Sequence, residues 1–123
     1  MEKARELNDA ESMSKGLKEL GNLKLQLTLE NCMDAVHKYW LARNNIHKLY
    51  PSLSEGNPKE EVKLLAGNIY PTSIRDCLTN LMFHGNRKQR QARLDPQRFF
   101  RLLEKTAGKI DAFFAIGGSG LFQ

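Results

Sequence analysis

The chain has 123 residues, which is enough for one domain with a modest core and too few for two. Nineteen Lys and Arg residues against fourteen Asp and Glu residues give a net charge of +5, which mildly favours anionic partners. No run approaches the roughly 18 apolar residues of a membrane span, and the N-terminus lacks the apolar stretch of a secretory signal. We therefore expect a cytoplasmic protein without a membrane partner.

The first half of the chain predicts two long helices. Residues 2–20 carry apolar side chains at spacings of three and four, which is typical of an amphipathic helix. Residues 23–30 alternate like a strand, but no second convincing strand is present to pair with them, and leucine is a strong helix former. We therefore predict that 23–30 is helical and continuous with a helix over 32–50, whose apolar stripe includes Trp40.

Proline residues mark the beginnings of the later helices. Asn57 and Pro58 provide an N-cap followed by proline at the first helical position. Pro71 opens the next helix, and Asp95 with Pro96 caps the last one.

Together these elements predict an all-α fold, an up-and-down bundle of four to five helices with short connections. We expect a single helical domain over residues 1–116 and a flexible, glycine-rich tail over 117–123. Residues 85–94 are expected to form a loop before the last helix.

Histidines and cysteines do not form a metal-ligand pattern in this sequence. His37, His47 and His84 share no ligand spacing, and Cys32 and Cys77 lie in no C-x-x-C motif. We expect no metal and no cofactor. The two cysteines are predicted to be buried, reduced thiols, and the first two histidines to be structural or solvated.

The segment from Leu78 to Lys88 carries the strongest functional signal. Asn80 and His84 lie one helical turn apart and so share a face, and Gly85 is a natural helix end. A basic run follows, which indicates either a solvated surface or a phosphate-binding one. The basic residues that we predict to contact nucleic acid are Arg87, Lys88, Arg90 and Arg93.

Residues 79–88 resemble the signature of the HEPN superfamily, in which an arginine, often followed by asparagine, precedes a histidine and frequently a glycine. The resemblance implies a compact α-bundle whose motifs meet across a homodimer to form a metal-independent ribonuclease. It makes His84 the acid/base residue and Asn80 an orienting residue. Thr79 stands where the family has arginine, so Arg75, one turn earlier on the same face, is the candidate for the missing cation.

Three hypotheses follow. The leading one is a HEPN-like homodimer that binds RNA or a nucleotide phosphate, with residual ribonuclease activity. The alternatives are a non-enzymatic module that binds a protein partner and a DNA-binding protein. Because Thr79 replaces a cation, the segment favours phosphate binding over catalysis.

Overall fold

The computed structural model describes residues 2–27 and 31–115 and confirms the all-α helical fold. Six α-helices are present in these ranges, where four to five were predicted, and the tail over 117–123 lies outside them. In chain order, with η for a 3-10 helix, the elements are α1 (Glu2–Asn22), β1 (Leu25–Gln26), α2 (Cys32–Leu49), η1 (Pro51–Glu55), α3 (Pro58–Gly67), β2 (Ile69–Tyr70), α4 (Thr72–His84), α5 (Arg87–Gln91), η2 (Ala92–Leu94) and α6 (Pro96–Ala115).

The predicted beginnings of the later helices are confirmed. The Asn57 side chain accepts a hydrogen bond from the Lys59 amide at 2.9 Å and so caps α3. The Asp95 carboxylate accepts one from the Gln97 amide at 3.2 Å, in the first turn of α6. The segment between Pro71 and Gly85 is α4, as expected.

The prediction of helix over residues 23–30 was wrong for residues 23–27, and residues 28–30 lie outside the described ranges. Residues 25–26 form β1, which pairs in parallel with β2. Leu25 and Leu27 are buried while Gln26 between them is exposed, so the alternation in the sequence did report a half-buried strand. Its partner is only two residues long, too short to be recognised from its own pattern.

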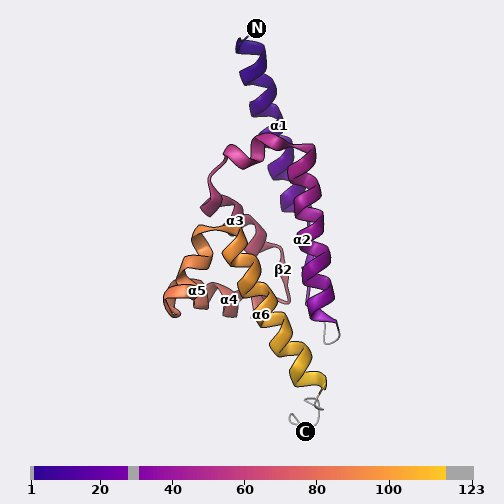
Figure 1. Cartoon of the computed structure of the whole chain (residues 1–123), viewed down its shortest axis with the longest axis vertical. Coiled ribbons are helices and arrows are strands. Elements are labelled where there is room, and N and C mark those ends of the chain that lie inside the picture. Colours follow the sequence, from indigo (N-terminus) through magenta and orange to yellow (C-terminus); the bar gives the residue numbers. More distant parts are fainter. Residues whose placement is uncertain (1, 28–30, 116–123) are drawn as a thin grey trace.

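Helix α6 presents opposite chemistry on its two faces. Phe99, Leu103 and Ala107 are fully buried, and α6 packs against α2, α3 and η2 (Figure 1). Arg101 and Lys105, on the other face, are exposed. None of the helices in the described ranges is long and apolar enough to cross a membrane.

The beginning of α2 is capped from a distant part of the chain. Asn31 has a left-handed backbone, with φ of 59°, and its side chain makes no capping hydrogen bond. Instead, the Asp111 carboxylate on α6 accepts hydrogen bonds from the Cys32 amide at 2.8 Å and the Met33 amide at 2.9 Å. The first turn of α2 therefore depends on α6.

A buried polar cluster joins α2 to α3. The Glu61 carboxylate, on α3, accepts hydrogen bonds from Arg43 Nε at 2.7 Å and Nη2 at 3.3 Å. His47 Nε2 lies 2.7 Å from the same carboxylate. Glu61 is 8% exposed, so its charge is compensated almost entirely by these two side chains of α2.

A second polar cluster secures the turn between α3 and β2. The buried Asn68 amide donates to the Leu20 carbonyl at 2.7 Å and to the Tyr39 hydroxyl at 3.2 Å. The Tyr39 hydroxyl in turn donates to the Leu65 carbonyl at 3.0 Å. Three helices thus share one hydrogen-bonded network at the point where the strand pair begins.

Candidate nucleic-acid interface

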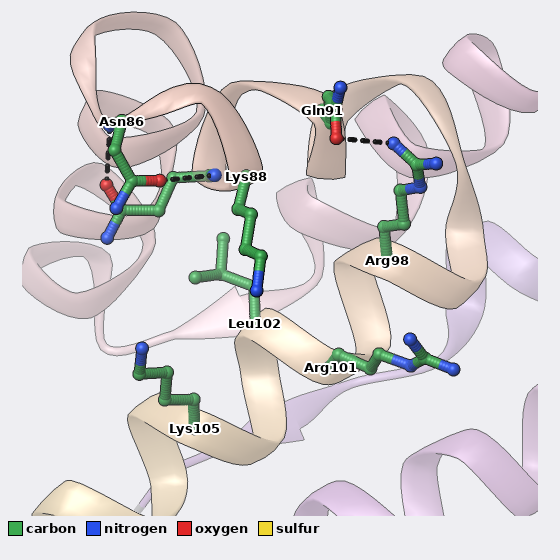
Figure 2. A pocket seen from close by; sticks show the side chains of 8 residues that line it. Asn86, Lys88, Gln91, Arg98, Arg101, Leu102 and Lys105 are labelled. Carbon is green, nitrogen blue, oxygen red and sulfur yellow. Dashed lines mark hydrogen bonds between the residues drawn. The ribbon is translucent and has the colours of Figure 1, made fainter.

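A basic groove of about 450 Å³ lies between α5 and α6. Figure 2 shows Lys88 reaching from α5 toward α6, with Arg101 and Lys105 on α6 below it. We call this cavity the α5/α6 groove. Its lining residues include four cations and no carboxylate, and they are Asn86, Lys88, Gln89, Gln91, Arg98, Arg101, Leu102 and Lys105.

Helix α5 forms one side of the groove, in a segment that we had predicted to be a loop. Asn86 and Gln89 form a reciprocal capping box: each side chain accepts a hydrogen bond at 2.9 Å from the backbone amide of the other residue. Gly85, directly before this cap, lies so close to the Leu81 carbonyl and the Gln89 side chain that a Cβ at this position would clash with both. The prediction of a loop over residues 85–94 was therefore wrong: the capping box begins the short helix α5, and η2 follows it.

Helix α6 supplies the other side of the groove. Arg98, Arg101 and Lys105 are spaced by three and four residues, so they share one face and span roughly 10 Å along the axis. Arg98 Nη1 donates to Gln91 Oε1 at 2.6 Å, which holds the guanidinium against α5. It also lies 3.9 Å from Asp95. Within the described ranges, Lys88, Arg101 and Lys105 form no ion pair, so their charges are uncompensated there.

The residues of the HEPN-like motif lie elsewhere, on the exposed face of α4. Asn80 and His84 are both exposed and do share a face, as their spacing predicted. Thr79 Oγ1 donates to the Arg75 carbonyl at 2.9 Å, so its hydroxyl is engaged by the backbone of its own helix. The motif residues line a shallow hollow, the α4 hollow, formed by Asp76, Thr79, Asn80, Phe83 and His84.

Arg75 is not among the residues that line the α4 hollow. Its Nη1 donates to the Gly67 carbonyl at 3.3 Å, and its guanidinium lies 5.9 Å from the centre of the Tyr70 ring. Both contacts are at the beginning of α4, whereas His84 is at its end. Among the described residues that line the hollow, the Asp76 carboxylate is therefore the one ionisable group beside Asn80 and His84.

The structure separates the four basic residues predicted to contact nucleic acid. Lys88 lines the α5/α6 groove, whereas Arg87 and Arg90 are exposed on α5 outside its lining. The Arg93 guanidinium carbon lies over the Phe83 ring, 5.2 Å from the ring centre. Arg98, Arg101 and Lys105 were not among the predicted contacts, although their spacing of three and four residues on one helix face was a usable signal.

The cysteines differ from each other. Cys32 is buried, as predicted, and burial together with the neighbouring Asp111 carboxylate raises the pKa of its thiol. Cys77 is exposed, so the prediction of its burial was wrong, because it lies on the outer face of α4. Over residues 2–27 and 31–115, no group of three histidine, cysteine or acidic side chains lies close enough to hold a metal ion.

His37 and His47 both lie beside carboxylates. The exposed His37 has its Nε2 2.9 Å from Glu104 on α6. His47 belongs to the buried cluster with Glu61. Both residues were predicted to be structural or solvated; His37 is solvated as well as paired, and His47 takes the structural alternative.

Comparison of the chain with protein-family models, with curated proteins and with solved structures found no match. The chemistry of the groove and of the α4 hollow is therefore the basis on which a function is assigned.

Proposed function

We propose that this protein binds RNA through phosphate contacts in the α5/α6 groove. The observation that carries the proposal is the collection of four cations around one groove whose lining includes no carboxylate. Neutralising phosphates with Lys and Arg, and releasing their counterions, supplies most of the affinity of non-specific nucleic-acid binding. The groove has the composition that this mechanism requires.

The spacing of the cations favours a polynucleotide over a single nucleotide. Arg98 and Lys105 are separated by roughly 10 Å along α6, which is more than one phosphate group covers. Lys88 adds a charge from the opposite side. Gln89 and Gln91 also line the groove. Their side-chain oxygens accept hydrogen bonds from the Asn86 amide and from Arg98, which leaves their NH2 groups as donors to sugar hydroxyls and base edges.

The α4 hollow supports binding more than cleavage. A cation beside Asn80 and His84 would stabilise the charge of a phosphoryl-transfer transition state, and the hollow has a carboxylate there instead. Cleavage by the motif would need an arginine from a second subunit, such as Arg87 or Arg90, and we retain it as the secondary hypothesis.

The proposal is tested by titrating fluorescently labelled single-stranded RNA at several salt concentrations. If all four groove cations contact phosphates, the logarithm of the association constant should fall with log salt at a slope of about −3. Arg101→Glu and Lys105→Glu should each weaken binding and make the slope shallower. The matched control is Lys18→Glu, which removes the same charge from an exposed position on α1.

Two results would overturn the proposal. One is the absence of RNA binding at low salt, which would favour the protein-interaction hypothesis. The other is an equal loss of affinity in Lys18→Glu and Arg101→Glu, which would show that net charge and not the groove determines binding. A preference for duplex DNA in the same titration would support the DNA-binding hypothesis.

The secondary hypothesis has its own assay. RNA is incubated with the protein in excess EDTA and analysed on a denaturing gel. Cleavage that disappears in His84→Ala would assign activity to the α4 hollow, whereas cleavage at an unchanged rate in that variant would remove His84 from the mechanism.

A further inference from the structure

A second cavity, of about 480 Å³, lies between α3, α4 and η2 and has an apolar floor. Val62, Ala66 and Met82 form that floor, and each is less than 10% exposed. Phe83 and Leu94 stand beside it and are 53% and 39% exposed. We call this cavity the α3/α4 site. Two large apolar side chains are thus left in water next to a preformed apolar surface.

Positive charge surrounds this floor. Lys59 and Lys63 lie on α3 one turn apart, and Arg93 lies on η2. Glu60 is the single carboxylate among the lining residues. In the described part of the chain none of the three cations forms an ion pair. Like charges at positions i and i+4 repel each other, so an anionic ligand beside Lys59 and Lys63 would relieve an unfavourable pair.

The two cavities differ in chemistry. Leu102 is the one apolar residue that lines the α5/α6 groove, whereas the floor and one wall of the α3/α4 site are apolar. A phosphate backbone would gain nothing from covering Phe83 and Leu94. A ligand that fits the α3/α4 site must bring apolar surface and negative charge together.

We propose that the α3/α4 site docks a short acidic amphipathic helix of a partner protein. One apolar face of such a helix would cover Phe83 and Leu94, as in other helix-in-groove complexes. Carboxylates one turn apart on its flank would match Lys59 and Lys63, and another would meet the Arg93 guanidinium, which its stacking on Phe83 holds beside the apolar floor. This interaction is independent of RNA binding in the α5/α6 groove.

The test uses a phage-displayed library of random peptides of about 12 residues, roughly three helical turns. Selection on the wild-type chain should enrich peptides that combine large apolar residues with a net negative charge. The affinity of the best peptide, measured by fluorescence anisotropy, should fall by on the order of tenfold in the Lys63→Glu/Arg93→Glu double variant. The same peptide with its carboxylates changed to lysine should prefer that double variant over the wild type.

The matched control is Arg101→Glu/Lys105→Glu, which removes the same charge from the α5/α6 groove and should leave peptide affinity unchanged. Circular dichroism and thermal unfolding verify that both double variants remain folded. The proposal is overturned by no enrichment, by enrichment of neutral or basic peptides, or by equal loss of affinity in the two double variants. It is also overturned if single-stranded RNA displaces the peptide, or if the peptide dissociates an oligomer, because nucleic acid or a second copy would then occupy the site.

Discussion

Asp111 is the side chain on which the first turn of α2 depends. It satisfies the amides of Cys32 and Met33, two of the four that a helix N-terminus leaves without a partner inside the helix. Its charge also lies at the positive end of the helix dipole. Asn31, the N-cap residue, makes no capping hydrogen bond with its side chain.

We predict that Asp111→Ala lowers the free energy of unfolding by about 1–2 kcal/mol, the usual effect of losing an N-cap. Asp111→Asn, which retains one acceptor oxygen, should lose less. Urea denaturation measures both changes. Asp76→Ala is the control, since Asp76 is exposed and forms no hydrogen bond or ion pair in the described structure; its effect should stay within about 0.5 kcal/mol. Equal effects at the two positions would contradict the capping role.

Tyr39 gives the fold a defined response to alkaline pH. Burial raises the pKa of its hydroxyl to about 12, a rise that Asn68 moderates by donating a hydrogen bond and that Glu61 reinforces by its charge. The unfolded chain would release this proton near pH 10. Between these values the folded state holds a proton that the unfolded state has lost, so the contribution of Tyr39 to stability falls as pH rises.

We therefore predict that Tyr39→Phe is less stable than the wild type near neutral pH, by about 1 kcal/mol, because its hydrogen bonds to Leu65 and Asn68 are lost. The difference between the two proteins should shrink or reverse from pH 10 to 12. Chemical denaturation across this range measures it, and Tyr70→Phe at a partly buried position is the control. A difference that stays constant with pH would contradict the raised pKa.

Helices α2 and α3 are joined by the buried ion cluster around Glu61. The Arg43 side chain is 12% exposed and has its guanidinium 4.5 Å from the centre of the Trp40 ring. It therefore depends on Glu61 for most of its charge compensation. Removing one member of such a cluster leaves the other charge buried and unpaired.

Glu61→Ala should consequently destabilise the fold by about 3 kcal/mol or more. The neighbouring Glu60 is exposed, so Glu60→Ala should change stability by no more than about 0.5 kcal/mol. Thermal or urea unfolding compares them directly. Similar values for the two variants would show that the cluster contributes no more than a surface carboxylate.

The sequence predicted elements well where a local signal existed. The caps at Asn57 and Asp95 and the end of α4 at Gly85 were correct because each depends on one or two neighbouring residues. Strand β1 was missed because its pairing partner β2 lies more than forty residues further on and has only two residues. Helix α5 was missed although Asn86 and Gln89 have the spacing of a capping box, because its five residues carry no apolar pattern that would indicate a helix.

The same limit applies to the site. The basic run was visible in the sequence, and Asn80 and His84 share a face of α4 as their spacing predicted, but Lys88 lines a different cavity from them. The sequence did not show that the run divides between two cavities. Arg98 lines the α5/α6 groove and Arg93 lines the α3/α4 site, because of how α3, α4, η2 and α6 pack together.

The homodimer expected from the HEPN-like motif remains a prediction. Light scattering coupled to size-exclusion chromatography should give twice the 14.1 kDa chain mass. A monomer at concentrations where RNA binds would contradict the composite ribonuclease, which needs an arginine from a second subunit. It would leave RNA binding intact, because all four cations of the α5/α6 groove belong to one chain.

The capping of α2 by Asp111 has a consequence for any shortened form of this protein. Figure 1 shows the C-terminal end of α6 extending past α2 toward one end of the molecule, where trimming would seem harmless. Yet a stop codon or protease cut before position 111 would remove the cap from a helical turn that lies 79 residues earlier in the chain. Deletion and fusion boundaries should therefore be placed after α6, which ends at Ala115.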